Sequence, residues 1–403
     1  MDHLLFLTHR IPYPPNKGDK IRSYHLLKHM AQHYHVHLGT FIDDEDDWQY
    51  VDKVKALCGE TYFGKLNPAT ARYGSLTAML TGRPLTLDYY RDAGLRRWVA
   101  DLLEQHPVDR FLVFSSAMAQ FVPPRAVGTR VIDFVDIDSD KWAQYADKKS
   151  WPMNLVYRRE ARKLLDYERR IAGEFDASLF VSQTEARMFR TMAPEHAHKI
   201  AAFTNGVDTD YFSPDHVLEN PYTPDEQAIV FTGAMDYWPN VDAVDWFARE
   251  IFPGVRRNHP AAVFYIVGSK PSVQVQALAR LPGVKVTGRV EDVRPYIAHA
   301  RLAVAPLRIA RGIQNKVLEA MAMASTVVVT PQALEGICAT PGAELLLAAD
   351  SSDFTATVNA QLARPNSAIG GAARALVIAH YGWTSNLASV DRCFSAEPER
   401  LAC

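Results

Sequence analysis

Three polar residues in the second half of the chain, Asn315, Lys316 and Glu319, have types and spacings that suit a ligand site. Residues three and four positions apart lie next to one another on the surface of a helix. A lysine there can neutralise a diphosphate, and a carboxylate one turn along can accept hydrogen bonds from ribose hydroxyls. The alternative is an exposed ion pair between Lys316 and Glu319, which would contribute little to stability. The element that carries these residues favours the ligand site.

The stretch 301–330 predicts a strand, a loop, a helix and a second strand in succession. Leu302–Leu307 and Thr326–Thr330 are runs too short for helices, and apolar residues at helical spacing lie between them. Such a βαβ unit belongs to a parallel sheet, which binds ligands at the carboxyl ends of its strands. Backbone N–H groups of Gly312 and Ile313, at the start of the helix, should point at a phosphate there.

Length and composition describe an ordinary globular protein of two domains. The chain has 403 residues, and its formal net charge of -2 gives no electrostatic reason to bind nucleic acid. The four cysteines form no CxxC pair, which is typical of a reducing compartment. The chain begins with too few apolar residues for a signal peptide, and no apolar run reaches the roughly 18 residues of a membrane span. We expect a cytoplasmic protein.

In the first half of the chain, a loop after the apolar strand Leu4–Leu7 is a candidate binding site. It contains Gly18, which lets the backbone approach a ligand closely, and it brings together Asp19, Lys20 and Arg22. The loop lacks the GxGxxG pattern, so nothing in the sequence supports a nicotinamide or flavin cofactor.

A cluster of carboxylates, Asp136, Asp138 and Asp140, follows the strand predicted at Arg130–Val135. Asp-x-Asp at a strand end can hold a metal ion on a nucleotide diphosphate. A carboxylate that orients an acceptor hydroxyl, or one that caps the next helix, explains the pattern equally well.

Four histidines, His29, His33, His35 and His37, have spacings that resemble a set of metal ligands. The first two lie near the end of a predicted helix, whereas the other two share one face of the strand predicted at Val36–Phe41. This order places them at the sheet edge opposite the binding loops, and we expect no metal site.

The stretch Lys141–Arg170 is helical in pattern and unusually rich in aromatic and basic residues. Trp142 and Trp151 are among its aromatic residues, and Arg158 and Arg162 are among its cations. Such a face is usually solvated. It also suits an anionic membrane surface, with aromatic rings at the interface and cations at the headgroups.

A domain junction is predicted at Asn205-Gly206, a turn signal followed by a proline-rich segment. Beyond it, Gly233, Gly268 and Gly288 each follow a predicted strand. Small residues at three successive strand ends leave room for a nucleotide at the place where the strand order reverses.

Six segments of the chain resemble the retaining, metal-independent glycosyltransferases of family 4, which have the GT-B fold. They are PYPPNKGDKIRSYHLL, FDASLFVSQTEA, TNGVDTDYFSP, FTGAMDYWPNVDAVDWF, VTGRVEDVRPYIAHARLAVAPL and GIQNKVLEAMAMA, and they span nearly the whole length. A finer resemblance, carried by DFVDIDSDKW, is to sugar transferases associated with exosortase-linked exopolysaccharide clusters.

The resemblance implies an α/β protein of two facing Rossmann-like domains, with a central cleft and a C-terminal helix that crosses back to the first domain. Residues 1–205 would form the acceptor domain, 206–224 a linker, 225–378 the nucleotide-sugar donor domain and 379–403 the returning helix.

In the donor domain, the resemblance implies a ribose contact at Glu319 and a nucleobase near the backbone of Arg289 and Val290. Together with the residues read from the pattern alone, the other expected donor-binding residues are Gly233, Gly288, Arg311, Gly312, Ile313, Asn315 and Lys316. Arg311 stands where the family has a second carboxylate, and GAMDYWPN lacks the usual Arg and Lys pair.

In the acceptor domain, the loop near the phosphate and the acceptor is expected to include Gly18, Lys20, Arg22 and Ser116. Ser115 or Ser116 replaces a histidine that is customary in the family after the fourth strand. The expected catalytic set is Lys316 and Glu319, with Asp138 or Asp19 orienting the acceptor hydroxyl.

The function implied is a retaining hexosyltransferase of polysaccharide biosynthesis, with a nucleotide-diphosphate sugar as donor and a glycan or polyprenyl-linked acceptor. It would need no cofactor and no metal, bind no nucleic acid, and be able to rest on the anionic inner face of a membrane. Three alternatives stay open: a sugar-nucleotide epimerase of the same fold, a non-catalytic sugar-nucleotide-binding subunit, and a metal-dependent transferase that uses Asp136 and Asp138.

Overall fold

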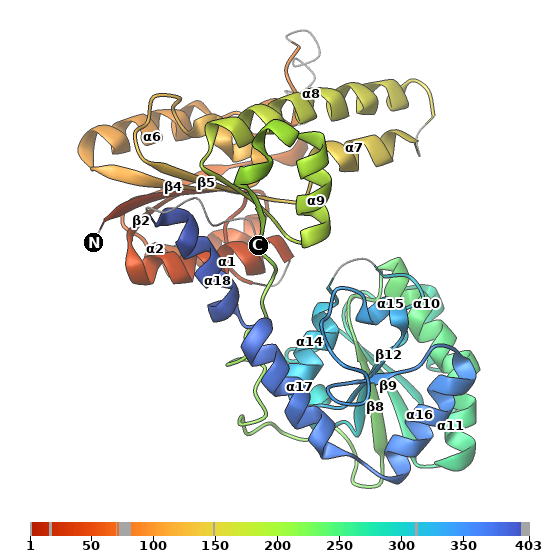
Figure 1. The fold of residues 1–403 in the computed structure, drawn as a ribbon. Helices are drawn as coiled ribbons and strands as arrows, with labels where there is room; N and C mark the ends of the chain where they lie inside the picture. The colour runs from red at the N-terminus through yellow and green to blue at the C-terminus, as the bar shows by residue number, and fades with distance from the viewer. Residues whose placement is uncertain are drawn as a thin grey trace. The chain divides into compact units, whose positions relative to one another are not determined.

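The computed structural model describes residues 2–15, 18–69, 71, 82–147, 150–310 and 313–395. The chain divides into two compact α/β units (Figure 1). Unit 1 comprises Met1–Asn205 together with Asn386–Cys403, and unit 2 comprises Gly206–Ser385. Among the described residues, no helix is long and apolar enough to cross a membrane.

Unit 1 is built on a seven-stranded sheet with the order β3-β2-β1-β4-β5-β6-β7. Every neighbouring pair of its strands is parallel. The strands are β1 (His3–Thr8), β2 (His35–Ile42), β3 (Thr61–Lys65), β4 (Val108–Phe114), β5 (Thr129–Val135), β6 (Ala177–Phe180) and β7 (Ile200–Ala202).

Helices cover both faces of this sheet, with α1, α2 and α18 on one side and α6, α7 and α8 on the other (Figure 1). The α-helices are α1 (Gly18–His33), α2 (Val51–Lys55), α5 (Leu85–Tyr89), α6 (Ala93–Gln105), α7 (Asp138–Asp147), α8 (Met153–Glu174), α9 (Gln183–Met192) and α18 (Trp383–Phe394). Three 3-10 helices are η1 (Glu45–Tyr50), η2 (Ser116–Phe121) and η3 (Pro194–Lys199).

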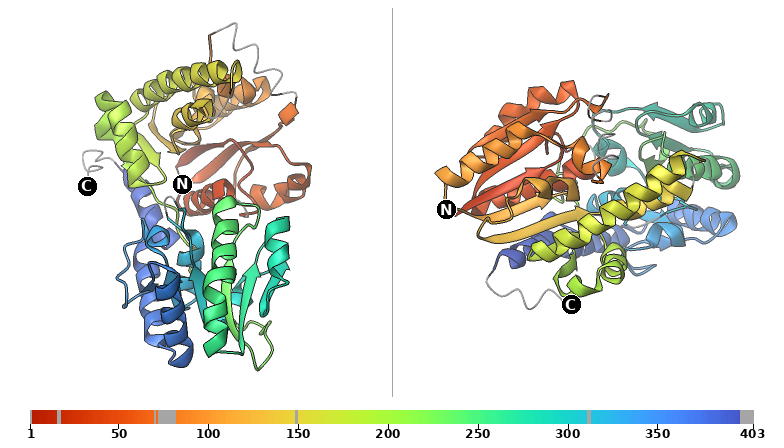
Figure 2. Two further views of the ribbon diagram at one scale, coloured as in Figure 1. Left: turned by 90° about the vertical axis from the view of Figure 1, so that its right-hand side faces the viewer. Right: turned by 90° about the horizontal axis from the view of Figure 1, so that it is seen from above.

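Unit 2 contains a six-stranded parallel sheet with the order β10-β9-β8-β11-β12-β13. Its strands are β8 (Gln227–Thr232), β9 (Ala262–Val267), β10 (Val284–Gly288), β11 (Leu302–Ala305), β12 (Val327–Val329) and β13 (Leu346–Leu347). Figure 2 gives two further views, in which the colours of unit 2 run from green to blue.

In unit 2, α14 and α17 lie on one face of the sheet, and α10, α11 and α16 lie on the other (Figure 1). The helices are α10 (Trp238–Trp246), the π-helix η4 (Phe247–Ile251), α11 (Phe252–Asn258), α12 (Val273–Leu278), α13 (Arg294–His299), α14 (Asn315–Ala322), α15 (Pro331–Leu334), α16 (Ser351–Ala363) and α17 (Ser367–His380).

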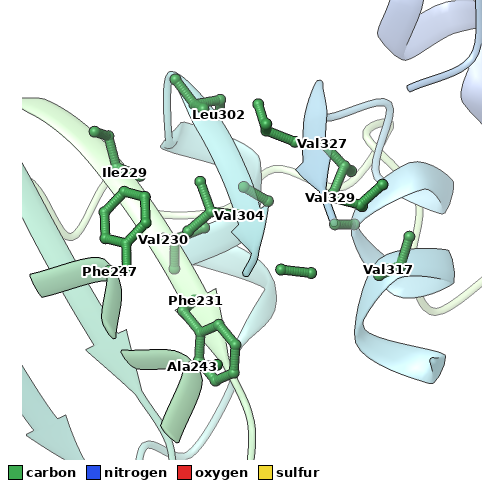
Figure 3. Packing of buried hydrophobic residues seen from close by; sticks show 14 of the residues in the cluster. Ile229, Val230, Phe231, Ala243, Phe247, Leu302, Val304, Val317, Val327 and Val329 are labelled. Atoms are coloured by element: carbon green, nitrogen blue, oxygen red, sulfur yellow. The ribbon is translucent and has the colours of Figure 1, made fainter. Parts of the chain in front are cut away.

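The core of unit 2 explains why its strands are continuous apolar runs. Strands with helices on both faces have no solvent side, so apolar residues need not alternate with polar ones. Successive residues Ile229, Val230 and Phe231 of β8 are all buried. Figure 3 shows them with Val304 of β11 and with apolar side chains from β12, α14, α10 and η4.

The strands predicted from apolar runs are present. In the described chain, the sequence analysis missed β3 and the two short strands β7 and β13. The segment expected to be a linker, 206–224, packs on unit 2. Tyr222 is buried and donates to the backbone carbonyl of Tyr296, and Arg374 of α17 donates to the carbonyl of Phe212 at 3.0 Å.

Two cations that were expected to bind ligand are buried inside unit 1, and this corrects the prediction. Arg22 is fully buried, and its guanidinium donates to both carboxylate oxygens of Asp133 at 2.6 and 3.0 Å. Lys20 is 1% exposed, and its Nζ donates to Asp47 at 2.6 Å. Neither donor is free to bind a phosphate, so both residues hold the start of α1 in place.

Asp133→Asn should destabilise unit 1 strongly, because it leaves the Arg22 charge buried without its counter-ion. Loss of one partner of a buried pair costs about 3–5 kcal/mol. The matched control is Asp109→Asn, which breaks an exposed pair with Arg110 and should cost less than about 1 kcal/mol. Urea unfolding measures both, and equal costs would contradict the structural role of Arg22.

Candidate functional site

The strand order of unit 2 reverses between β8 and β11, and this is where an open parallel sheet binds ligands. Gly233 follows β8, and α14, which carries Lys316 and Glu319, follows the loop after β11. The structure therefore brings Gly233 and Lys316 to the place that the sequence analysis expected for the donor.

Glycines at the carboxyl ends of β8 and β9 bring two backbones into close contact. Gly233 and Gly268 have φ values of +157° and +153°, and a Cβ atom on Gly268 would lie 1.7 Å from the carbonyl oxygen of Gly233. No other residue fits there. Gly288 ends β10, and its backbone carbonyl accepts from Gly268. The result is a strand edge lined by glycine backbone, over which the side chains of Asn240 and Lys316 lie at Gly233.

Lys316 is held over this edge by an asparagine from α10. Its Nζ donates to Asn240 Oδ1 at 2.5 Å and lies 5.0 Å from the centre of the Phe231 ring. The amide of Asn240 in turn donates to the carbonyl of Ala234 at 2.9 Å. The lysine side chain is thereby fixed beside Gly233, with its Cε 3.5 Å from where a Cβ atom on that glycine would be.

Burial opposes both charges on the polar face of α14. It lowers the pKa of Lys316 to about 8, although the nearby Glu319 carboxylate acts in the other direction. Burial likewise raises the pKa of Glu319 to about 7, although the charge of Lys316 opposes it. Each charge is thus poorly compensated in the free protein. A diphosphate beside Lys316 would supply the missing counter-charge.

The other predicted donor residues are distributed around the same edge of the sheet. Asn315 is the first residue of α14, and Ile313 packs against the core. After β10, Arg289 is exposed and Val290 packs against the core. Arg311 and Gly312 lie outside the described residues.

Unit 1 has a cavity of about 510 Å³ at the corresponding reversal, between β1 and β4. Aromatic side chains form much of its wall, and two of the predicted catalytic carboxylates, Asp19 and Asp138, line it together. The lining aromatic residues are Tyr89, Tyr90, Phe114, Phe134 and Trp142, and the other polar or charged residues are His9, Thr86, Ser115, Asp136 and Lys141.

Asp19 belongs to a charged group at the end of β1. Its Oδ2 accepts from Arg10 at 2.7 Å and lies 3.6 Å from Nε2 of His9. Burial alone would raise the pKa of Asp19, but the hydrogen bond from His9 and the charge of Arg10 lower it far below its usual value. Within the described part of the chain, the buried Nδ1 of His9 has no hydrogen-bond partner. His9 lines the cavity, but this nitrogen is buried and not exposed to it.

Asp138 lies at the start of α7, where Ser116 and Lys141 contact it. Ser116 Oγ donates to Asp138 at 3.3 Å, and Lys141 Nζ lies 2.8 Å from Asp136 and 3.4 Å from Asp138. Ser116 is fully buried. It therefore supports Asp138 and does not contact ligand directly, which corrects the prediction; its neighbour Ser115 lines the cavity. Gly18 begins α1, and a Cβ atom there would contact no other protein atom, so the expected approach of a ligand to this backbone stays a prediction.

A buried carboxyl of α8 fixes the start of α7. Glu168 accepts from the backbone N–H of Ser139 at 3.2 Å and from its hydroxyl at 2.5 Å. Burial raises the pKa of Glu168 to about 8, although the hydrogen bonds from Ser139 lower it. Asp138 is the residue before Ser139, so Glu168 holds one wall of the cavity.

The raised pKa of Glu168 predicts a pH-dependent stability that Glu168→Gln should remove. Since the folded state holds this proton more tightly than the unfolded chain, the contribution is present below the ordinary pKa of 4.5 and lost as the pH rises through about 8. Glutamine keeps the hydrogen bonds without ionising. The free energy of unfolding, measured at several pH values, should fall less with rising pH in Glu168→Gln than in the wild type. The control is Glu174→Gln, an exposed change on the same helix, which should show the pH dependence of the wild type. If Glu168→Gln shows that same pH dependence, Glu168 is not its source.

The four histidines singled out from the sequence separate into two groups. His29 of α1 pairs with Asp391 of α18 at 2.8 Å and contacts His33. His35 and His37 instead lie beside His3, at the amino ends of β1 and β2, and His106 before β4 joins them. Burial, and then the neighbouring imidazoles, lower the pKa of His37 to about 4.

Sequence reasoning missed Asn240, His9 and the aromatic wall of the cavity. Pro239 marks the first turn of α10, but no local signal connects Asn240 with Lys316, which lies 76 residues along the chain. His9 comes directly after a predicted strand, and that position was a usable signal.

The two units and their parallel sheets define the class: the architecture is that of GT-B glycosyltransferases. Sucrose-phosphate synthase from Thermosynechococcus elongatus has a similar structure, with a TM-score of 0.63, 15% identity and coverage of 98% of each chain. WaaG, a glycosyltransferase involved in lipopolysaccharide biosynthesis, has the same score and identity over 98% of this chain and 100% of its own. HepE from Anabaena, solved with UDP-glucose, reaches 0.61 and 14% over 98% of this chain and 100% of its own.

The sequence comparison locates the resemblance in unit 2. Residues 226–364, which lie within unit 2, match the family described as group 1 glycosyl transferases. The matched segment includes Gly233, Asn240, Lys316 and Glu319. No curated protein sequence matches the chain.

Proposed function

We propose that this protein is a retaining, metal-independent glycosyltransferase of family 4. It moves a hexose from a nucleotide-diphosphate sugar to a glycan or polyprenyl-linked acceptor in the synthesis of a polysaccharide. The observation that carries the proposal is the partly buried cation of Lys316, held by Asn240 over the glycine edge of unit 2, within a segment that matches group 1 glycosyl transferases.

The leaving diphosphate gives Lys316 its role. Negative charge develops on that group as the bond to the sugar breaks, and a preorganised cation stabilises it most in the transition state. The same diphosphate offsets the burial of the Lys316 charge, which the free protein leaves poorly compensated. Glu319, three residues along α14, accepts hydrogen bonds from the ribose hydroxyls of the donor.

The cavity of unit 1 is the proposed acceptor site. Aromatic rings such as Tyr90 and Trp142 offer flat apolar faces to a sugar ring, while the carboxylates bind its hydroxyls. His9 lines the cavity beside Asp19, but its unpartnered Nδ1 is buried, so the ring has to turn before that nitrogen can accept a hydrogen bond from the attacking hydroxyl. Asp138 orients the acceptor. The hydroxyl attacks the anomeric carbon on the face that the diphosphate leaves, so configuration is retained.

A panel of nucleotide sugars, with and without glycan and polyprenyl-phosphate acceptors, tests the activity directly. UDP-glucose is the first donor to try, since HepE was solved with it. Transfer that needs an acceptor and survives EDTA supports the proposal. Turnover without acceptor would indicate an epimerase, inhibition by EDTA would indicate a metal-dependent enzyme, and no turnover with any donor would indicate a binding subunit.

Glu319→Gln should weaken donor binding in a pH-dependent way. Loss of charge-assisted hydrogen bonds is worth roughly 1.5–3 kcal/mol, or about 10- to 100-fold in KM for the donor. Because the pKa of Glu319 is about 7, the wild-type carboxyl is ionised at higher pH and resembles glutamine at lower pH. The KM difference should therefore be large near pH 8 and small near pH 6. Asp225→Asn, an exposed change before β8, is the control.

Lys316→Met should act on turnover. Removal of a transition-state charge contact costs about 10²–10³ in kcat, with a smaller effect on KM. Wild-type kinetics in both Lys316→Met and Glu319→Gln would refute this assignment of the donor site.

The tip formed by α7 and α8 is a proposed membrane contact for a lipid-linked acceptor. Tyr145, Trp151 and Leu155 are 54%, 75% and 55% exposed there, and Arg158 and Arg162 of α8 are exposed beside them. Arg159, by contrast, donates to the carbonyl of Arg83 and belongs to the fold. Exposed rings next to cations suit the headgroup region of an anionic bilayer.

Arg158→Gln combined with Arg162→Gln should weaken binding to vesicles that contain anionic lipid. Each cation near such a surface contributes about 1 kcal/mol, so the pair should lower the partition coefficient about 30-fold at low salt. Arg97→Gln with Arg125→Gln removes the same charge from other exposed positions of unit 1 and serves as the control. If both double variants pellet with the vesicles to the same extent, the tip is ordinary solvated surface and not a membrane contact.

A further inference from the structure

A cluster of four imidazoles lies at the amino ends of the unit 1 strands. The ring centres of His3, His35, His37 and His106 lie 4.8–5.3 Å apart in the contacting pairs. Three of these residues, His3, His37 and His106, each offer a ring nitrogen within 4.8 Å of the other two. The unit 1 cavity lies at the carboxyl ends of the strands, so this cluster belongs to neither candidate site.

We propose that His3, His37 and His106 bind a divalent transition metal ion of the zinc class. Imidazole nitrogens are preferred ligands of Zn²⁺, at about 2.0–2.1 Å, which sets nitrogen atoms about 3.3 Å apart in a tetrahedral site. His3 Nδ1 and His37 Nε2 are already 2.9 Å apart. His106 has to move toward them together with Glu60, whose carboxylate it contacts; both side chains are partly exposed.

The surroundings of His106 are those of a metal ligand. Its Nε2 is 2.7 Å from the carboxylate of Glu60. An imidazole that donates one N–H to a carboxylate keeps its other nitrogen unprotonated, more basic and fixed in direction, which is the common outer arrangement around protein-bound zinc. His37 is fully buried, whereas His3 and His106 are partly exposed, so the ion can enter from solvent and keep a water molecule as a fourth ligand.

Binding requires a change in the hydrogen bonds of His37. In the metal-free protein the backbone N–H of Glu60 donates to His37 Nδ1 at 3.1 Å, so the ring proton is on Nε2 and points at His3. To ligate through Nε2, His37 must carry its proton on Nδ1 instead, and the bond from Glu60 is given up. Two hydrogen bonds, the one from the Glu60 backbone and the one between His37 and His3, are thus exchanged for bonds to the metal ion.

The role that follows is structural. The three ligands come from the start of β1, the start of β2 and the segment just before β4, which are distant in the sequence. An ion that binds them only in the folded chain stabilises unit 1. The proposal is independent of the glycosyltransferase activity, and it predicts that EDTA lowers the melting temperature without stopping transfer.

The full chain, stripped with a chelator and dialysed, is titrated with Zn²⁺, with Co²⁺ as a spectroscopic probe and with Mg²⁺ as a negative control. We expect one Zn²⁺ per chain by metal analysis after gel filtration, a melting temperature raised by several degrees, and the intense visible bands of low-coordinate Co²⁺. Mg²⁺, which prefers oxygen ligands, should have no effect. Absence of stoichiometric zinc, or of the cobalt bands, would overturn the proposal.

Variants separate the cluster from adventitious binding. His106→Gln can still donate to Glu60, so the metal-free fold should be kept while zinc affinity falls at least 100-fold. Glu60→Gln, which changes only the partner of a ligand, should lower affinity by about 10- to 100-fold. His380→Gln removes an exposed histidine at the end of α17 and should bind as the wild type does. Unchanged zinc affinity in His106→Gln would show that the ion binds elsewhere.

Discussion

The parallel alignment of every strand pair in both sheets is the constraint on which the candidate sites depend. A parallel strand must be returned by a crossover, so all carboxyl ends of a sheet meet at one edge. Where the order reverses, successive crossovers leave on opposite faces and their loops diverge. His9 and Ser115 follow the two strands at that point in unit 1, and Gly233 and Lys316 lie after the corresponding strands of unit 2. The topology therefore selects which loops can meet a ligand.

Buried charges have opposite meanings in the two units. The charge of Arg22 is matched by both oxygens of Asp133, so that pair is complete and serves the fold. Lys316 and Glu319 are also poorly solvated, but burial shifts the pKa of each against its charged form. A group whose charge is suppressed in the free protein gains most when a ligand supplies its partner. Burial raises the pKa of Asp133 as well, so Lys316 is distinguished by its place beside Gly233 at the carboxyl edge of the sheet and not by its pKa.

The sequence predicted much of the fold because its strands are local features. An apolar run such as Leu4–Leu7, or the glycine after β8, can be recognised without knowing what lies next to it. The helical face of Asn315, Lys316 and Glu319 was predictable for the same reason. Contacts between residues that are distant in the sequence could not be predicted from it. Arg22 and Asp133 are 111 residues apart. The sequence analysis placed Arg22 in a ligand-binding loop and Asp133 within a predicted strand, and only the structure shows that the two form a pair.

Ser116, Lys20 and Arg22 illustrate a second reason for error. Residue type indicates what a side chain can bind, but a parallel sheet turns successive residues at a strand end in different directions. Ser115 therefore lines the cavity while its neighbour Ser116 is buried under Asp138. A polar residue directed inward must find an internal partner, and the sequence does not record the direction.

The carboxyl edges of the two sheets differ chemically, and the difference suits a nucleotide-sugar donor on unit 2 and a sugar acceptor on unit 1. Unit 2 presents backbone and one held cation beside Gly233, which suits a phosphate because N–H groups and positive charge both favour an anion. Unit 1 presents aromatic faces with carboxylates, which suit a sugar ring that is apolar on its faces and polar at its rim. A carboxylate-lined cavity such as that of Asp19 and Asp138 repels a diphosphate. On the proposed assignment, the side chains that bind acceptor hydroxyls in unit 1 also disfavour a nucleotide there, which leaves unit 2 for the donor.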